Sequence, residues 1–393
     1  GAWAHSPQPC TELQMACSSK WGWGAKRTLD ETQKLYEAGV VTYPRTDTGC
    51  LTSDLKQDIP AHLAALAKHP DFKDLARIKP EYRSSVFNDA KVEDHHGIIP
   101  TDQKCDPSRL DDSSRKLFDL IARRFLASLM PDAKGRRTVI STELDGIPFR
   151  TGGTIIDELG WKAVWKGQEE PGEKKKSEDD EDGELPPVNN GDKGKSGKVL
   201  VDSKTTKPPA HYTEGTLLKA MLNAGSKDPD AEIRDLLSNG GLGTQATRQE
   251  IIEKLKFRDF ARLQGKKIIS TERARHFVAI LREESSRLVD VAATADLERR
   301  LREIEKDSTA MPSIWHEYVR NLNADIDALR HKPVRRKLPP SPQSSSKGGT
   351  RRKSAGTKSS SSRKPKGKTY TPRKSSGGSR AKGRSPSRGK RTR

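Results

Sequence analysis

The stretch that decides the fold is Val40-Val41-Thr42-Tyr43-Pro44-Arg45-Thr46-Asp47-Thr48, called the Tyr43 motif below. Proline pushes the residue before it into extended backbone, so Tyr43 cannot belong to a helix. Two-residue alternation then places Arg45 on the same side of the chain as Tyr43. A phenol with a pKa of about 10 is a poor nucleophile unless a cation assists it, and an arginine fork matches phosphate oxygens. The motif indicates either a tyrosine that attacks phosphate or an ordinary half-buried strand tyrosine beside a surface arginine.

Helices are predicted on both sides of the Tyr43 motif. Thr28 and Glu31 have the spacing of a capping box that opens a helix, and Gly39 closes that helix. Further predicted helices start at Thr11, with Gln14 as its capping partner, and span about 55–67 and 113–129.

The chain changes character at about residue 136. Residues 137–143 and 153–156 are rich in β-branched side chains, and Asp145-Gly146 between them predicts a hairpin turn. An acidic insert at about 167–198 is expected to be a solvated loop rather than a metal site. Val199-Leu200-Val201 is predicted to be a returning strand, and the chain from Tyr212 to about Arg330 is predicted to be helical.

The basic charge of the chain is concentrated at one end. Residues 331–393 contain 22 Lys and Arg and no Asp or Glu, whereas the whole chain has a net charge of +20. The remaining residues are therefore close to neutral. Basic runs spaced by Ser and Gly cannot bury a core, so residues 331–393 are expected to be disordered and to contact nucleic-acid phosphates without sequence choice. A solubilising tail and a membrane-surface tail remain as alternatives.

Cysteine usage and hydropathy limit the class of protein. Cys10, Cys17, Cys50 and Cys105 form no CxxC pair, which argues against a zinc ribbon and fits reduced thiols in a cytosolic or nuclear setting. No apolar run approaches 18 residues, so no membrane span is expected. The chain begins without an initiator Met or a signal peptide, and we expect it to begin within a longer protein.

A second motif is Asp94-His95-His96-Gly97-Ile98-Ile99-Pro100-Thr101. Two adjacent histidines on a loop do not have the spacing with which helical zinc sites bind one metal ion. A histidine beside a phosphate can instead donate a hydrogen bond or move a proton. The alternative is an ordinary polar loop.

A third motif, Gly240-Gly241-Leu242-Gly243-Thr244-Gln245-Ala246-Thr247-Arg248-Gln249-Glu250, is called the glycine-rich motif below. Thr247 and Glu250 have the spacing of a capping box, so a helix is predicted to start there behind a flexible loop. Free N–H groups at a helix start bind anions, and Arg248 would reinforce that site. A well-capped helix without a ligand explains the pattern equally well. A fourth stretch, from Tyr212 to Met221, predicts an amphipathic helix start whose Leu217, Leu218, Met221 and Leu222 face a core.

In this order the four stretches resemble the type IA DNA topoisomerases, most of all the bacterial topoisomerase III branch. The Tyr43 motif is similar to the active-site motif of that family, and residues 94–101 to its histidine loop, with Gly97 where alanine is more usual. Residues 212–221 and 241–252 are similar to two later family motifs, and residues 268–272 to the segment that follows them. The resemblance covers about residues 11–325.

The resemblance implies a mechanism and a site. Tyr43 would be the nucleophile that cuts one DNA strand and forms a 5′-phosphotyrosyl link, with Arg45 at the scissile phosphate and His95 contacting DNA or assisting proton transfer. The glycine-rich motif would hold the bound, mainly single-stranded DNA through Thr244, Thr247 and Arg248. A second strand would pass through the gap before religation, without ATP.

The resemblance also implies an α+β multidomain fold with a toroidal core. The expected division is an unassigned start (1–10), a winged-helix-like catalytic domain (11–133), a β arch (134–208), a helical DNA-binding domain (209–330) and a basic tail (331–393). The family holds Mg²⁺ on a Toprim domain, whose acidic cluster is not found in this sequence, so that segment is expected to be missing or separate. A catalytically inert single-strand DNA-binding remnant is the alternative function. The implied location is cytoplasmic and nucleoid-associated in a bacterium, or nuclear in a eukaryote.

Overall fold

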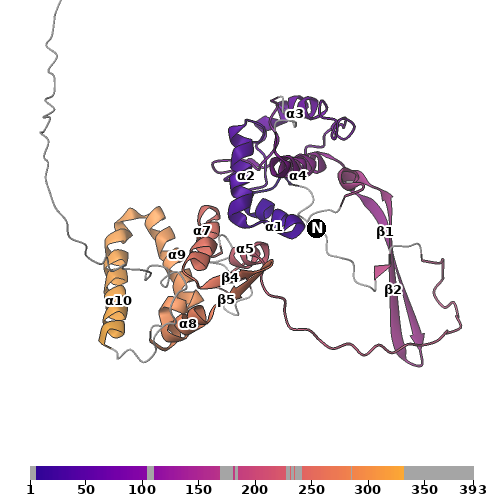
Figure 1. Ribbon diagram of the computed structural model, residues 1–393. Helices are drawn as coiled ribbons and strands as arrows, with labels where there is room; N and C mark the ends of the chain where they lie inside the picture. Colours follow the sequence, from indigo (N-terminus) through magenta and orange to yellow (C-terminus); the bar gives the residue numbers. More distant parts are fainter. Residues whose placement is uncertain are drawn as a thin grey trace, which may run out of the picture. The chain divides into compact units, whose positions relative to one another are not determined.

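The computed structural model describes residues 6–103, 110–168, 180–181, 185–226, 231, 234, 241–284 and 286–331. The predictions for Cys105, for Gly240, for residues 169–179 and 182–184 of the acidic insert, and for the basic tail after His331 lie outside these residues. The elements in chain order are α1 (Cys10–Trp21), α2 (Ala25–Glu37), η2 (Asp54–Gln57), α3 (Ile59–Leu66), η3 (Asp89–Lys91), α4 (Asp112–Leu129), β1 (Lys134–Leu144), β2 (Ile147–Glu158), η5 (Gly160–Trp165), β3 (Asp180–Glu181), α5 (Glu214–Leu222), α7 (Gln245–Phe257), β4 (Ala261–Gln264), β5 (Lys267–Ser270), α8 (Glu272–Glu284), η6 (Ser286–Val289), α9 (Val291–Lys306), η7 (Ser308–Ala310) and α10 (Met311–His331). Figure 1 labels the α-helices and most of the strands.

Helices α1 to α4 enclose the main hydrophobic core. Leu13 of α1, Leu35 of α2 and Phe125 of α4 are fully buried in this core, together with Phe72 from the loop after α3. Removing a side chain of this size from water stabilises the fold by about 1.5–3 kcal/mol. The predicted helices in this region are therefore confirmed, although their starts differ from the prediction.

Both capping boxes predicted before Tyr43 are wrong. Helix α2 begins at Ala25, so Thr28 lies inside the helix, and its hydroxyl donates to the Gly24 carbonyl at 3.2 Å. Helix α1 begins after Pro9, and the Gln14 amide donates to the Ala25 carbonyl at 3.1 Å. Gln14 and Glu31 thus bind partners from other elements, since the Ser114 hydroxyl donates to Glu31 at 3.2 Å, whereas Thr28 bonds the backbone at the start of its own helix. Gly39 does close α2 in the left-handed backbone region, as predicted, with φ of 74°.

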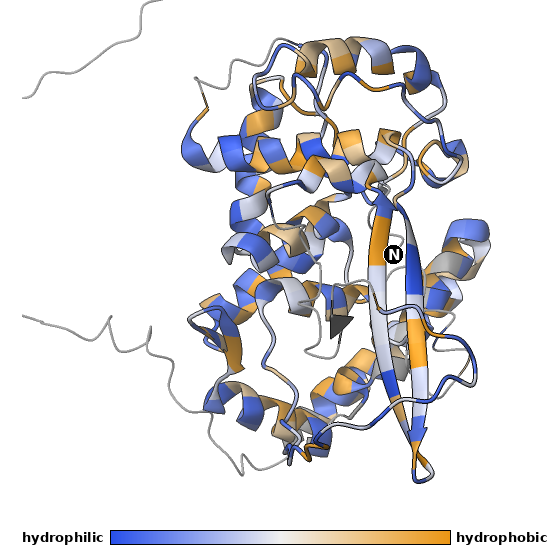
Figure 2. Ribbon diagram, turned by 90° about the vertical axis from the view of Figure 1, so that its right-hand side faces the viewer, coloured by the Kyte–Doolittle hydropathy of each residue, from blue (hydrophilic) through white to orange (hydrophobic). Residues whose placement is uncertain are grey.

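The predicted hairpin is confirmed. Strands β1 and β2 pair antiparallel, and the turn places Asp145 and Gly146 at positive φ, as a type I′ turn requires. Most side chains of both strands are exposed, so polar and apolar residues lie in the open along the ribbon (Figure 2). At its base, η5 returns Trp161 and Trp165 to the main core. The hairpin is anchored to the main core at this end, and β2 also pairs in parallel with the short strand β3 at Gly152 and Gly153.

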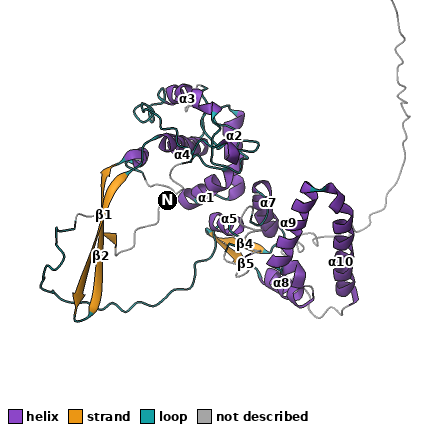
Figure 3. Ribbon diagram, turned by 180° about the vertical axis from the view of Figure 1, so that it is seen from behind, coloured by secondary structure: helices purple, strands orange, loops and turns teal. Residues whose placement is uncertain are grey.

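Two predictions after residue 198 are wrong. Val199, Leu200 and Val201 are exposed and belong to no strand, because three β-prone residues without a paired neighbour do not form a sheet. The stretch from Tyr212 to Arg330 is not entirely helical. It contains the β4–β5 hairpin, whose turn places Gly265 at a φ of 61° (Figure 3).

Helices α5 and α7 share a second, smaller core. It contains Leu218 and Met221 of α5, Ile252 of α7 and Ala25 of α2, with Leu217 packed against them. The prediction that α5 turns its leucines and methionine to a core is confirmed for Leu217, Leu218 and Met221.

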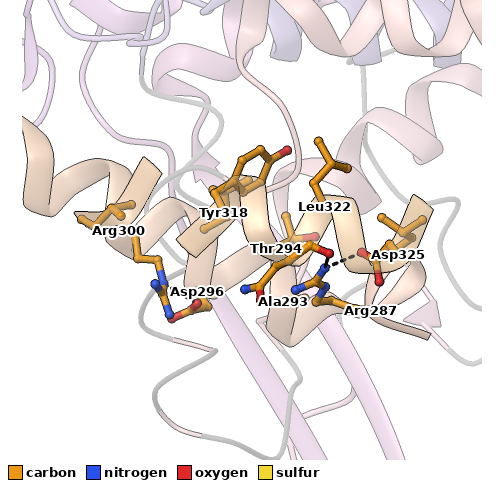
Figure 4. A pocket seen from close by; sticks show the side chains of 12 residues that line it. Arg287, Ala293, Thr294, Asp296, Arg300, Tyr318, Leu322 and Asp325 are labelled. Carbon is orange, nitrogen blue, oxygen red and sulfur yellow. Dashed lines mark hydrogen bonds and ion pairs between the residues drawn. The ribbon is translucent and has the colours of Figure 1, made fainter. Parts of the chain in front are cut away.

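A cavity of about 330 Å³ lies between η6, α9 and α10 (Figure 4). Its arginines are already neutralised, because Arg287 pairs with Asp325 and Arg300 pairs with Asp296 and Glu317. We therefore do not treat it as an anion site. None of the described helices is long and apolar enough to cross a membrane.

Candidate active site

The side chains of Tyr43 and His95 meet, although 52 positions separate them in the sequence. Their ring centroids are 4.5 Å apart with the planes tilted by 49°. Tyr36, from the last turn of α2, packs edge-on against the Tyr43 ring at 5.4 Å. The phenol ring therefore contacts both a second tyrosine and a histidine.

Backbone pairing between two loops brings these rings together. Val41 and Pro100 form an antiparallel bridge, and the Thr42 N–H donates to the Ile99 carbonyl at 2.9 Å. The Thr46 hydroxyl donates to the His95 carbonyl at 2.8 Å. Sequence analysis missed Thr46, and its signal was the alternation of the motif, which turns position 46 inward.

The alternation predicted for the Tyr43 motif is confirmed. Pro44 and Thr46 are buried, whereas Tyr43 is half-buried and Arg45 is exposed. Arg45 makes no hydrogen bond or ion pair with another described residue, so its guanidinium is available to a ligand on the side of the chain that Tyr43 shares.

Two glycines let the loops approach. A Cβ on Gly49 would lie 2.3 Å from the Pro7 carbonyl oxygen, and a Cβ on Gly97 would lie 3.0 Å from the Pro7 Cβ. The two histidines of the second motif have different surroundings. His96 Nδ1 lies 2.8 Å from the carbonyl oxygen of Gly97, whereas His95 is exposed and lies beside Tyr43.

The glycine-rich motif does start a helix, but three residues earlier than predicted. Helix α7 begins at Gln245, and the Thr244 N–H donates to the Thr247 hydroxyl at 2.9 Å, so the Thr247–Glu250 capping box is wrong. Thr244 and Thr247 are exposed. Glu250 instead pairs with Lys254 within the helix. A helix start with two exposed hydroxyls suits an anion such as a phosphate.

Arg248 is buried, at 4 % exposure, and its Nε donates to the Leu242 carbonyl at 3.2 Å. Burial lowers the pKa of the Arg248 guanidinium, and the Asp47 carboxylate opposes that shift. Asp47 of the Tyr43 motif and Arg248 of α7 therefore interact electrostatically. The third predicted DNA-binding residue thus lies behind the helix surface rather than on it.

The Tyr43 motif and the start of α7 adjoin each other through α1. The Gln245 side chain lies near the Cys10 thiol, whose pKa it acts to lower, and the Gln14 amide donates to the Gln249 side chain at 3.2 Å. Burial raises the pKa of both the Cys10 and the Cys17 thiols to about 12, so neither is a nucleophile at neutral pH. Tyr43 is the better candidate.

No group of three or more His, Cys, Asp or Glu side chains among the described residues could hold a metal ion. The residues described here therefore do not fit the Mg²⁺ that the resemblance implies, and no step of the mechanism below runs through it.

The chain belongs to the type IA DNA topoisomerase family, since the family model described as DNA topoisomerase matches residues 3–314. The chain is similar to DNA topoisomerase 3 of Bacillus subtilis, with 37% identity over 82% of this chain and 46% of the relative. DNA topoisomerase 3 of Bacillus cereus is 33% identical over 84% of this chain and 46% of the relative. The chain thus spans less than half the length of these relatives.

A solved structure supports the same fold. Full-length topoisomerase I from Thermotoga maritima superimposes with a TM-score of 0.56 at 24% identity, over 80% of this chain and 49% of that one. At this identity the likeness speaks for the fold alone.

Proposed function

We propose that this chain is the strand-cutting part of an enzyme that changes DNA topology without ATP. The Tyr43 hydroxyl oxygen attacks the phosphorus of one strand, the bond to the 3′ oxygen breaks, and a 5′-phosphotyrosyl link forms. The phenol gives up its proton and the leaving 3′ oxygen gains one. The reverse attack religates the strand, and because the covalent link conserves the bond energy, no nucleotide is consumed.

The observation that carries this proposal is the contact between Tyr43 and His95. An exposed imidazole beside the phenol can hydrogen-bond the attacked phosphate or exchange a proton with a reacting oxygen. Arg45, exposed on the same side, would offset charge on the phosphate. The three residues have complementary roles within one small area.

The glycine-rich motif would hold the bound strand. Its two exposed threonines, Thr244 and Thr247, would contact the phosphate backbone at the positive end of α7. Arg248, being buried, would act through its charge or after leaving the Leu242 carbonyl. We further propose the toroidal arrangement and domain limits that the resemblance implies, with Mg²⁺ ligands supplied by a Toprim segment of the whole protein.

Replacing Tyr43 with phenylalanine tests the proposal. In the full-length protein, Tyr43→Phe should abolish the covalent adduct with a single-stranded oligonucleotide labelled on its 3′ side, while DNA affinity stays within about twofold. Tyr36→Phe is the matched control, since it removes a hydroxyl from the ring packed against Tyr43 and should leave the adduct. An adduct that survives in Tyr43→Phe would refute the assignment. Binding without an adduct in the natural protein would favour the inert single-strand binder.

The basic tail should add affinity without sequence choice. Deleting residues 331–393 removes 22 positive charges. Each phosphate contact contributes a slope of about −0.7 to log affinity against log salt on single strands. The truncated protein should therefore show a clearly shallower slope in a fluorescence binding titration. An unchanged slope would mean that the tail does not contact DNA.

A further inference from the structure

Glu214 is a buried carboxylate at the first position of α5, with 5 % exposure. Its Oε2 accepts a hydrogen bond of 2.8 Å from the N–H of Ala25, the first residue of α2. The two residues are 189 positions apart in the sequence. A side chain of one helix therefore occupies the position of an N-cap on another.

Helix α2 has no cap of its own. Its N-cap residue is Gly24, which has no side chain, and its first turn contains no acidic residue. The first N–H groups of a helix need acceptors, and a negative charge there is favoured by the helix dipole. Glu214 supplies both the hydrogen-bond acceptor and the negative charge. A Cβ at position 24 would lie 2.8 Å from Glu214 Oε2, so glycine leaves the room that this carboxylate occupies.

Two further contacts fix the carboxylate. Lys256 of α7 pairs with Glu214 Oε1 at 2.8 Å and with Glu253 at 2.6 Å. Burial acts to lower the pKa of Lys256, but the hydrogen bonds that its ammonium donates to both carboxylates, together with their charges, outweigh burial and raise the pKa. The Gly215 N–H donates to the Ser18 hydroxyl of α1 at 3.1 Å, which holds the start of α5 against α1.

The other end of α2 leads directly to the proposed nucleophile. Tyr36 in its last turn packs on Tyr43, and Gly39 turns the chain into the Tyr43 motif. Because α2 is rigid over its 13 residues, fixing its first turn also fixes the place from which the Tyr43 loop departs. Glu214 is too deeply buried and too fully paired to reach DNA itself.

We propose that Glu214 is a positioning residue: it caps α2 from α5 and so couples the α5–α7 region to the placement of Tyr43. The link to catalysis rests on the function proposed for Tyr43. The cap on α2 does not depend on that function, so the cap and its link to catalysis can be tested separately.

The test is a double-variant cycle in the full-length protein. Glu214→Ala removes the cap, and the amides of the first turn of α2 should exchange with deuterium roughly tenfold faster, as expected for loss of an N-cap. Gly24→Ser alone should also speed exchange, because its Cβ collides with Glu214. The two together should restore protection to within about threefold, since serine is then a local N-cap with room for its side chain.

The same variants are then scored by the rate of adduct formation. Glu214→Ala should slow it roughly 10- to 100-fold, as small misplacements of a reacting group do, and the double variant should recover most of that loss. Glu214→Gln, whose amide oxygen can still accept from Ala25, should form the adduct at a rate between those of Glu214→Ala and the double variant. Glu253→Ala is the matched control, because it removes a partner of Lys256 while the Ala25 N–H keeps its acceptor, and it should leave both readouts unchanged.

Two results would overturn the proposal. If adding Gly24→Ser to Glu214→Ala fails to restore protection in the exchange measurement, the carboxylate is not the cap. If exchange follows the cycle while the rate of adduct formation does not, Glu214 is structural only. Absence of an adduct in the natural protein would instead refute the function of Tyr43 while the exchange cycle still reports on the cap.

Discussion

The region around α1–α4 and the β1–β2 hairpin are stabilised in opposite ways. The first buries Leu13, Leu35 and Phe125 completely in a shared core. The second exposes Val139 and Phe149 by 53 % and 41 % along two long strands that pair with each other and, at Gly152 and Gly153, with the short strand β3. A hairpin without a core of its own is only marginally stable in water, so this ribbon depends on its turn, on its base and on that pairing.

The two regions therefore have different roles: the α1–α4 region positions the reacting side chains, and the hairpin provides length. The Tyr43–His95 contact requires two loops to be fixed to within an ångström, and a close-packed core provides that. The hairpin contributes length, for which paired backbone is sufficient. Substitutions of the same kind in the two regions should therefore have very different effects.

The largest difference should come from deleting a phenyl ring in each region. Phe125→Ala opens a cavity at a fully buried site of α4 and should destabilise the protein by about 3–5 kcal/mol. Phe149→Ala in β2 should cost less than about 1 kcal/mol, because its ring is already partly hydrated. Urea unfolding followed by circular dichroism measures both. Equal losses would mean that the hairpin packs against something as well ordered as the core.

A smaller difference should separate the two ends of the hairpin. Gly160 at its base has a φ of 48°, and a Cβ there would lie 2.5 Å from the backbone of Asp132. Gly160→Ala should therefore cost more than the roughly 1–2 kcal/mol of a left-handed backbone alone. Gly146→Ala at the tip has a φ of 79° but no atom within 4 Å, so it should cost only the backbone term. Thermal unfolding of both variants compares them, and a larger shift for Gly146→Ala would contradict an anchored base.

The smallest effect should appear as a pH dependence. Burial raises the pKa of Glu12 in α1 from 4.5 to about 7, partly offset by Arg124. Between these values the folded state holds a proton that the unfolded state has lost, so stability falls as pH rises through this window. Glu12→Gln should remove that loss, gaining on the order of 1 kcal/mol relative to the natural protein between pH 5 and 7. Glu158→Gln in the exposed hairpin is the control and should show no such trend in unfolding temperature. A pH-independent difference for Glu12→Gln would show that the carboxyl ionises normally in the fold.

The sequence was sufficient to predict local structure at positions where one or two residues restrict the backbone conformation. The proline after Tyr43 predicted that Tyr43 lies outside a helix, and two-residue alternation predicted the side that it shares with Arg45; Tyr43 is non-helical, and burial alternates along the motif. Asp145-Gly146 predicted the hairpin turn, and Gly39 predicted the end of α2. Each of these depends on the φ values that one or two residues permit, which no distant contact needs to decide.

Tertiary structure alone decided where helices begin and which side chains meet. Ala25 starts α2 because Glu214, far along the chain, accepts its N–H, so the local Thr28–Glu31 pattern could not locate the start. Arg248 satisfied the pattern of an anion site yet lies buried against Leu242. The contact of His95 with Tyr43 arises only when two loops pair. Polar groups take whichever partner the fold brings nearest, and a linear pattern contains no information on that distance.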